Sequence, residues 1–214
     1  MLFVCISTIS FPLWAEEKWH RIKDTDEVRI YARSVEGSSF REYKAIIFYD
    51  VPFEVTVEIV KDYDHYRDWY GMCENLYIIE KRNNHDYDMY FVLDIPVVSD
   101  RDLVINITTS WDYKKGQSQI SIKSKDSKYK LDSGLVRMPK MDGRFKITRV
   151  NPNRTKAVYQ FFADAGGSIP SWIVNRGAWR HPYETIVGVL KEVRKAKYTE
   201  RANRLHKTNF KVPK

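Results

Sequence analysis

The sequence predicts an α+β domain in which an antiparallel sheet curls round one long C-terminal helix. Two observations lead to this fold class. Gly166–Lys195 has the apolar spacing of a long helix, and most of the chain between residues 28 and 163 consists of short strand-like stretches separated by turn residues. At 214 residues the chain is long enough for a sizeable core, and no repeat or linker divides it, so we expect a single folded domain.

Turn residues and prolines delimit the expected strands. These strands cover residues 28–33, 43–49, 76–80, 89–95, 103–111, 119–125, 135–138, 145–150 and 156–163. The last two are expected to form a hairpin across Asn151–Arg154, because Asn and Pro favour tight turns. Residues 19–23 are expected to form a short helix, and residues 53–63 a second one that begins after Pro52.

The long C-terminal helix combines a start signal, an apolar face and a basic end. Ser168 can cap the helix, and Pro170 lies where a proline is tolerated in the first turn. The residues that share the apolar face at steps of three, four or seven are Trp172, Trp179, Tyr183, Ile186, Leu190 and Val193, with Val187 beside them. Large aromatic side chains on such a face belong either to a solid core or to the wall of a cavity.

Two residues inside this helix favour the cavity. Glycine costs about 1 kcal/mol and proline about 3 kcal/mol in a helix interior, so a tightly packed rod would avoid Gly177 and Pro182. A helix that kinks, or that moves to admit a guest molecule, can accommodate both. We therefore expect the helix to act as a lid.

The positive charge is concentrated at the C-terminus. The chain carries a net charge of +8, and the stretch from Lys191 to Lys214 holds nine basic and two acidic residues, a balance of +7. Residues 198–214 are therefore expected to form a solvated basic tail, with transient contact to an anionic membrane as the alternative. Because the rest of the chain is nearly balanced, nucleic acid is not an expected partner.

The first fifteen residues have the composition of a leader. Residues 1–15 are apolar and uncharged, and Glu16–Lys18 that follow are all charged, which predicts a signal peptide cleaved after Ala15. The mature protein is then exported and periplasmic; the alternative is a cytoplasmic chain with a buried N-terminal segment. Cys5 belongs to the leader, which leaves Cys73 as a single, structural thiol.

No motif for a metal, a cofactor or a catalytic nucleophile stands out. The histidines are scattered, and none forms an HxxxH pair, so no metal and no cofactor are expected. His65 lies among three aspartates and could act as a general base, but a solvated loop histidine has the same surroundings. Arg101 follows Pro96 and stands between two aspartates, which fits either a rim ion pair or a cavity mouth. Arg137 points either to solvent or into a partly polar interior, because it alternates with Val136 and Met138.

Several segments together resemble the START domain, the steroidogenic-acute-regulatory-related lipid-transfer family of the Bet v 1-like helix-grip group. The matching segments are Val28-x-Ile-Tyr31, Asp62 with Trp69, Pro96-x-x-x-x-Arg101-Asp102, Val136-Arg137-Met138 and Gly166-Gly167-Ser168-Ile169-Pro170-x-Trp172-Ile173-Val174-Asn175. Their order and spacing carry the resemblance, which spans about Trp19 to Lys195. The predicted START-like domain is residues 16–197.

The resemblance implies a curved sheet that grips the last helix around a hydrophobic cavity for one lipid. It places Arg101 and Asp102 at the family's arginine–aspartate motif, and it places Trp172, Trp179, Tyr183 and Val187 on the gate helix. Arg101, Arg137 or Tyr90 would hold a polar head group. Sterol-binding relatives often have a second arginine where this chain has Ile107, so a fatty acyl or other apolar ligand fits as well as a sterol.

The expected function is therefore the binding of a lipid or other hydrophobic molecule by a monomer that is not an enzyme, with transfer of this ligand between membranes as a further expectation. One alternative is a cyclase- or hydratase-type enzyme of the same superfamily, with His65 or His181 as acid or base. Its distinguishing mark is a histidine that faces the cavity and has a carboxylate partner. A third hypothesis is a basic scaffold whose tail binds a membrane or RNA.

Overall fold

The computed structural model describes residues 18–95, 99–129 and 134–212. The strands are β1 (His20–Asp24), β2 (Val28–Val35), β3 (Ser38–Tyr49), β4 (Cys73–Asn83), β5 (Asp86–Leu93), β6 (Arg101–Asp112), β7 (Gln117–Ser124), β8 (Val136–Arg137), β9 (Lys140–Asn151) and β10 (Arg154–Asp164). The helices are α1 (Phe53–Lys61), the short 3-10 helix η1 (Tyr63–Asp68), α2 (Ser171–Gly177), α3 (Arg180–Glu192) and α4 (Ala196–His206).

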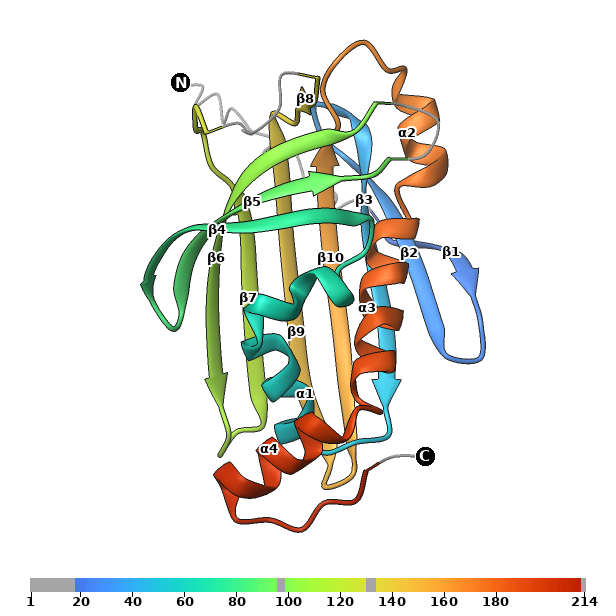
Figure 1. Ribbon diagram of the computed structural model, residues 1–214. Coiled ribbons are helices and arrows are strands. Elements are labelled where there is room, and N and C mark those ends of the chain that lie inside the picture. Colours follow the sequence, from blue (N-terminus) through green and yellow to red (C-terminus); the bar gives the residue numbers. More distant parts are fainter. Residues whose placement is uncertain (1–17, 96–98, 130–133, 213–214) are drawn as a thin grey trace, which may run out of the picture.

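All ten strands belong to one sheet that curves round α3 (Figure 1). Along the main path the strand order is β1-β2-β3-β10-β9-β7-β6-β5-β4, and neighbouring strands on this path run antiparallel. β8 lies off the path and pairs parallel with β6. The α+β fold class, with a curved antiparallel sheet and C-terminal helices, is confirmed.

The sheet buries the face that points toward α3. In β10, Ala157, Tyr159 and Phe161 are buried while their sequence neighbours are less so, which is the period-2 pattern of a strand with one face in the core. The hydroxyl of Tyr49 in β3 donates a 2.8 Å hydrogen bond to the carbonyl of Ile186, so the helix is attached to the sheet by a polar contact as well as by apolar packing. The hairpin across Asn151–Arg154 is confirmed by the pairing of β9 with β10.

The N-terminal segment is a strand where the sequence suggested a helix. β1 pairs antiparallel with β2 and extends the sheet at its edge, with His20 opposite Ala32. The expectation of a helix over residues 19–23 is therefore wrong. Local spacing in five residues cannot outweigh the backbone hydrogen bonds that the exposed edge of β2 offers.

The predicted helix over Gly166–Lys195 is two helices, α2 and α3, and a third, α4, follows it. α2 ends at Gly177, α3 begins at Arg180, and Ala178 and Trp179 between them keep right-handed backbone angles. Pro182 lies in the first turn of α3, where its missing N–H costs little. The predicted kink is thus confirmed, and it changes which side chains share a face: Trp172, expected on the buried face, is 65% exposed.

The basic segment after residue 197 is not a solvated tail through its length, as the sequence had suggested, because α4 covers the end of α1 (Figure 1). Tyr198 and Ala202 are buried, and the Arg201 Nε lies 2.9 Å from the carboxylate of Glu58, which is itself buried. A buried carboxylate requires a cationic partner, and the basic segment supplies one. The expected domain boundary at residue 197 falls inside α4.

The predicted leader, residues 1–15, lies outside the described residues. Within the described ranges, no helix has both the length and the apolar character that a membrane span needs.

The close approach of α3 to η1 depends on Gly188. A Cβ atom at this position would lie 2.2 Å from the backbone oxygen of Trp69, which is far inside van der Waals contact. Gly177, by contrast, has nothing within 4 Å of the position that a Cβ would take. The two glycines therefore have opposite roles, since one allows packing and the other lies at an open helix end.

We expect Gly188→Ala to lower the free energy of unfolding by about 1–3 kcal/mol, because relieving the overlap must displace α3 or the backbone at Trp69. Gly177→Ala is the matched control. It should leave stability unchanged or raise it by up to about 1 kcal/mol, since alanine has the better helix propensity. Urea unfolding of both variants measures this; equal stability of Gly188→Ala and the unsubstituted protein would contradict the packing argument.

Candidate ligand-binding site

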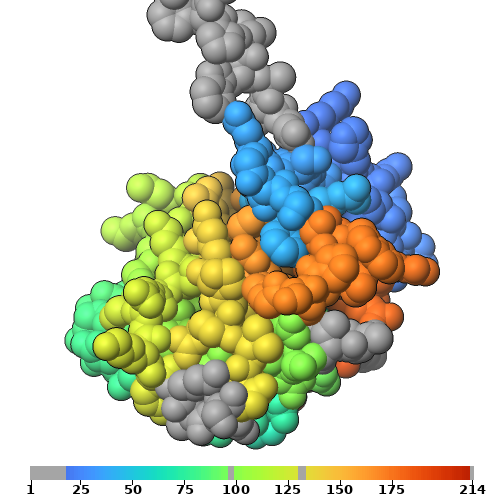
Figure 2. All heavy atoms as spheres, turned by 90° about the horizontal axis from the view of Figure 1, so that it is seen from above, coloured from blue at the N-terminus to red at the C-terminus, as the bar shows by residue number. Residues whose placement is uncertain are grey.

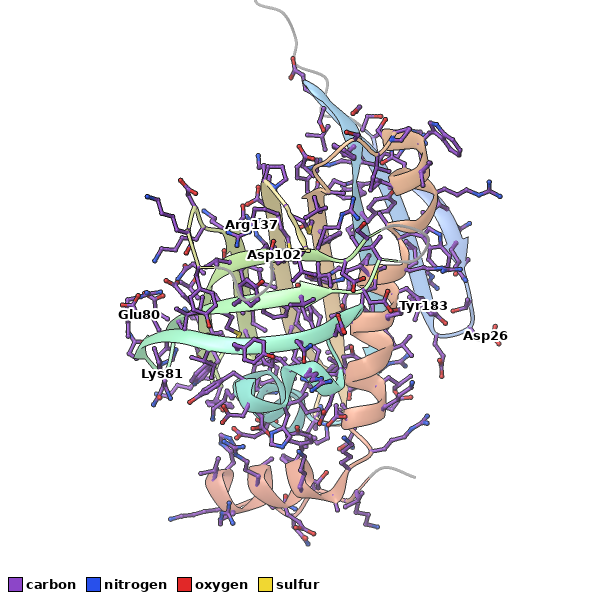
Figure 3. The ribbon with its side chains drawn as sticks, turned by 45° about the horizontal axis from the view of Figure 1, so that its top comes forward. Asp26, Glu80, Lys81, Asp102, Arg137 and Tyr183 are labelled. Carbon is purple, nitrogen blue, oxygen red and sulfur yellow. The ribbon has the colours of Figure 1, made fainter. Side chains whose placement is uncertain are left out.

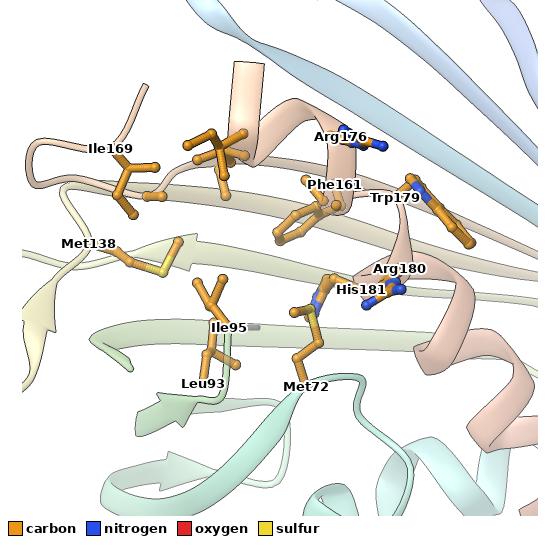
Figure 4. Close-up of a pocket in the computed structure, with 16 residues that line it drawn as sticks. Met72, Leu93, Ile95, Met138, Phe161, Ile169, Arg176, Trp179, Arg180 and His181 are labelled. Atoms are coloured by element: carbon orange, nitrogen blue, oxygen red, sulfur yellow. The ribbon is translucent and has the colours of Figure 1, made fainter. Parts of the chain in front are cut away.

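A cavity of 370 Å³ lies between the end of the sheet and the segment that contains α2 (Figure 4). Its lining is almost entirely apolar, with two arginines and one histidine as its charged or titratable members. The lining residues are Met72, Leu93, Ile95, Met138, Phe161, Ala163, Ala165, Ile169, Ile173, Val174, Arg176, Gly177, Ala178, Trp179, Arg180 and His181. A concave apolar site of this size suits a small hydrophobic molecule.

α2 forms the roof of this cavity and buries none of its residues completely. Ile173 and Val174 face the cavity, while Trp172 is exposed on the outside of the helix. Figure 2, which looks onto this end of the molecule, shows the orange segment of α2 against the blue side chains of the β2–β3 region. The helix therefore covers the cavity without being part of the main core.

Asn175 fixes α2 to β3. Its side-chain amide donates a 2.9 Å hydrogen bond to the carbonyl of Ser39, and its side-chain oxygen accepts a 3.0 Å bond from the backbone N–H of Arg41. The hydroxyl of Tyr43 also donates to the backbone carbonyl of Asn175, at 2.8 Å. These three hydrogen bonds attach α2 to β3 at a single residue of the helix that covers the cavity.

His181 lies at the inner wall of the cavity and is 2% exposed. Its Nδ1 lies 3.0 Å from the carbonyl of Gly71, so Nδ1 carries the proton, and its Nε2 accepts from the hydroxyl of Tyr159 at 3.1 Å. The Tyr159 hydroxyl in turn accepts from Tyr70, at 2.9 Å. Burial lowers the pKa of His181 to about 3, so the imidazole is neutral at physiological pH and both nitrogens are already engaged.

The second polar feature is a cluster around Asp102 in β6, beside β8, whose members do not line the cavity; Figure 3 labels Asp102 and Arg137. Asp102 is fully buried and accepts a bidentate pair of hydrogen bonds from Arg137, at 3.0 and 2.8 Å, and one from the hydroxyl of Tyr90, at 2.8 Å. The hydrogen bonds that Arg137 donates to Asp102 raise the pKa of Arg137. The charges in this cluster therefore compensate each other.

Arg101, the residue before Asp102, is hydrogen-bonded to backbone groups. It is 2% exposed, its Nε donates a 3.3 Å hydrogen bond to the carbonyl of Ala165, and its Nη1 donates to the carbonyl of Ser99. Burial lowers its pKa, and the nearby charge of Asp100 opposes that effect. The guanidinium is thus held by two backbone carbonyls.

The structure separates the predicted site residues into three groups. Trp179 lines the cavity, and Tyr183 packs edge-on against Trp179 with ring centroids 5.8 Å apart. Val187 packs against the main core instead of the cavity, and Trp172 points outward. The residues of the third group, which are buried or part-buried beside the cavity without lining it, are Arg101, Asp102, Tyr90 and Arg137.

Sequence analysis missed most of the apolar wall. Met72 and Met138 come from segments between strands, and Phe161 lies on the inward face of β10. The inward alternation of β10 was visible in the sequence, but nothing local distinguishes a side chain that lines a cavity from one that fills a core. Ile173, which widens the expected apolar face of the helix, and Val174 beside it form the roof because the helix breaks after Gly177.

Neither candidate catalytic histidine has the geometry of a general base at the cavity. His181 faces the cavity, but its partners are a carbonyl and a hydroxyl. His65 pairs with Asp62 at 3.0 Å but lies outside the lining. Burial raises the pKa of the Cys73 thiol to about 12, so it is not a nucleophile at neutral pH. In the described ranges, no cluster of three potential metal-ligating His, Cys, Asp or Glu residues occurs.

Comparison with known proteins agrees with this architecture. No family model matches the chain. An uncharacterised protein of Pseudomonas aeruginosa is 30% identical over 178 residues, which cover 81% of this chain and 85% of that protein. The human phosphatidylcholine transfer protein is 24% identical over 172 residues, covering 78% of this chain and 79% of that protein.

A solved structure shares the fold. The STAR-related lipid transfer protein fragment of Xanthomonas axonopodis superposes with a TM-score of 0.73 at 24% identity, covering 83% of this chain and 99% of that one. The chain has the fold of this STAR-related lipid transfer protein, and it belongs to one family with the Pseudomonas protein. The START resemblance of the sequence is confirmed in the fold.

The neutral state of His181 makes the stability of the folded domain depend on pH. The pKa of His181 is lower in the folded protein, about 3, than in the unfolded chain, about 6.5. The unfolded state therefore binds more protons below pH 6.5, and stability falls as the pH drops toward 3, by up to about 1.4 kcal/mol per pH unit from this residue. Above pH 6.5 the contribution is complete.

We expect His181→Gln to flatten the pH dependence of the unfolding free energy between pH 6.5 and pH 5, whatever its effect on stability at pH 7. Urea unfolding at several pH values measures the slope. His20→Gln, at an exposed position in β1, is the control and should keep the slope of the unsubstituted protein. If His181→Gln keeps that slope as well, the neutral buried imidazole is not its source.

Proposed function

We propose that this protein binds one lipid or other hydrophobic molecule in the cavity beneath α2 and transfers it between membranes. The observation that carries the proposal is the apolar cavity itself, roofed by a helix that is anchored at one residue. Burial of an alkyl chain there contributes about 0.8 kcal/mol per methylene group to binding. The two lipid-transfer relatives support the same function.

A carrier fits the site better than an enzyme of the same superfamily. Among the described residues, the lining contains no carboxylate, and both ring nitrogens of its histidine are engaged by a carbonyl and a hydroxyl. A cyclase or hydratase needs an acid or base within reach of its substrate. Binding without chemistry requires none.

The first test is native mass spectrometry of the purified protein, followed by organic extraction of any bound molecule. A stoichiometric lipid supports the proposal and identifies the ligand class. If the protein is empty and also takes up no fluorescent fatty acid, the proposal fails and the enzyme hypothesis becomes the better one.

Trp179 and Trp172 provide a matched pair for the binding wall. Trp179→Ala should weaken the binding of a fluorescent lipid analogue roughly tenfold, because the substitution removes a large apolar contact worth about 1.4 kcal/mol. Trp172→Ala removes an equally large ring from the outside of α2 and should leave the affinity unchanged. Equal affinities of the two variants, measured by fluorescence titration, would contradict the assignment of the wall.

We also propose that α2 is the gate, hinged at Gly177 and Ala178 and held closed by Asn175. Support comes from the helix break, the open space around Gly177 and the concentration of polar attachments at Asn175. In this mechanism the ligand enters when the contacts of Asn175 with β3 open.

Asn175→Ala should then speed ligand release several-fold, since each lost hydrogen bond contributes about 0.5–1.5 kcal/mol to the closed state. Stopped-flow transfer of a fluorescent lipid to acceptor vesicles measures the release rate. Asn153→Ala, in the β9–β10 hairpin, is the control. An unchanged release rate in Asn175→Ala would contradict the proposal that Asn175 holds α2 closed.

Export to the periplasm, action as a monomer and transient membrane contact through the basic C-terminus belong to the same proposal. The leader-like composition of residues 1–15 supports export. For membrane contact, part of the positive charge of the C-terminal segment is already compensated, because Arg201 and Lys197 lie near Glu58 and Asp62. Arg204 and Lys207 form no ion pair with a residue in the described part of the chain, and they are the basic residues we expect to meet anionic lipid.

A further inference from the structure

We propose that the ligand of the cavity is a single-chain amphiphile with an anionic phosphate head group, which Arg176 and Arg180 bind at the cavity mouth. The inference deepens the proposed function and rests on it. Three observations carry it: the place where the lining reaches solvent, the two arginines without acidic partners, and the distribution of acidic side chains around the cavity.

The cavity meets solvent at the junction of α2 and α3. Of the described residues that line it, only Arg176 and Arg180 are exposed, and the others are buried or half-buried. Figure 4 shows both arginines with Trp179 at one end of the cavity, whereas Met138 and Ile169 lie at the other. An amphiphile buries its alkyl chain and keeps its polar head near water. The head group therefore lies beside the two arginines.

Neither arginine at the mouth has an acidic partner. Within the ranges that the structure describes, the guanidinium groups of Arg176 and Arg180 form no ion pair and no hydrogen bond. The two residues are four positions apart, and Ala178 and Trp179 between them keep right-handed helical angles. Like charges at this spacing repel each other on a helix. An anion bound between them would relieve this repulsion.

A third cation lies close to the same end of the cavity. The Nζ atom of Lys23 in β1 is 4.2 Å from the ring centroid of Trp179 and 5.0 Å from that of Tyr183. Trp179 itself lines the cavity, and the described lining contains no acidic side chain. A site lined by charge of one sign attracts ligands of the opposite sign.

The acidic residue nearest to the arginines in sequence faces a different groove. Glu184 lies four positions after Arg180, a spacing that permits an ion pair, but Glu184 lines a groove next to Gly71 instead of the cavity. Three further acidic residues line that groove, Asp68, Glu74 and Asp94. The acidic side chains are therefore gathered outside the cavity, and the basic ones at its mouth.

Charge and size together define the ligand class. A phosphate monoester carries a charge of about −1.5 to −2 at pH 7 and offers three acceptor oxygens, which suits two guanidinium groups better than one carboxylate does. A choline head group adds a cation that Arg176, Arg180 and Lys23 would repel. A volume of 370 Å³ lies near the lower end of the range of about 300–1,000 Å³ for small-molecule sites, which favours one alkyl chain.

The test compares four ligands that share a twelve-carbon chain: dodecyl phosphate, dodecylphosphocholine, dodecanoate and dodecanol. Each displaces a neutral fluorescent probe from the unsubstituted protein at pH 8, below the concentration at which it forms micelles. Dodecyl phosphate should bind about tenfold more tightly than dodecanol and dodecylphosphocholine, and more tightly than dodecanoate. Inorganic phosphate alone should displace no probe, because the alkyl chain supplies most of the affinity.

Two double variants assign the preference to the mouth. Arg176→Gln/Arg180→Gln should lose the preference for phosphate and keep its affinity for dodecanol, which also shows that the variant is folded. Arg144→Gln/Lys146→Gln is the matched control. It removes two exposed positive charges from β9, outside the lining, and should keep the preference.

Several results overturn the inference. Equal or weaker binding of dodecyl phosphate than of dodecanol or dodecylphosphocholine would do so, and so would an unchanged preference in Arg176→Gln/Arg180→Gln. Tighter binding of dodecanoate would overturn the phosphate class, and displacement by inorganic phosphate would show an anion site that needs no alkyl chain. If none of the four dodecyl ligands displaces the probe and no lipid co-purifies, the proposed function itself fails, which is a distinguishable outcome.

A measurement on the unsubstituted protein tests where the head group lies. The ³¹P chemical shift of bound dodecyl phosphate is followed from pH 8 to pH 4, across the second ionisation of the phosphate near pH 6. Two nearby guanidinium groups favour the dianion, so the midpoint should fall below that of the free ligand. An equal or higher midpoint would place the phosphate away from the arginines and overturn the inference.

Discussion

The contact of α3 with the concave face of the sheet is the constraint on which the rest of the structure depends. Gly188 lets the helix approach the backbone of Trp69 at the end of η1. Buried hydrogen bonds from Tyr49 to Ile186 and from Tyr159 to His181 fix the helix to the sheet. These bonds are made between neutral groups, so the core is polar at several points without burying a net charge there.

The cavity is a consequence of that fixed helix. α3 fills the concave face only from Arg180 onward, and the chain before it breaks at Gly177 and turns away as α2. The sheet continues past the break, so its apolar inner face there, represented by Phe161 and Leu93, has no helix packed directly on it. α2 covers this face from a distance and is attached through Asn175 to β3 rather than through a packed core. The segment from α2 to α3 therefore packs tightly against the sheet at α3 and covers a cavity at α2.

Much of the fold could be predicted from the sequence because period-2 alternation and turn residues are local signals. β10, with Ala157, Tyr159 and Phe161 inward, is an example. The roles of Trp172 and α4 could not be predicted in the same way. The orientation of Trp172 depends on where the helix breaks, and the docking of α4 depends on Glu58, a buried carboxylate far away in the sequence. The site was predicted in part: Trp179 lines the cavity, but Met72 and Met138 reach it through tertiary structure alone.

The buried charges beside the cavity are hydrogen-bonded and do not belong to its lining. Asp102 accepts hydrogen bonds from Arg137 and Tyr90. Arg101, adjacent to Asp102 in sequence, donates to the carbonyls of Ala165 and Ser99, and the charge of Asp100 lies nearby. Burying a charge is costly unless the group is paired or hydrogen-bonded. Because neither Arg101 nor Asp102 belongs to the lining, the described cavity wall is apolar apart from Arg176, Arg180 and His181.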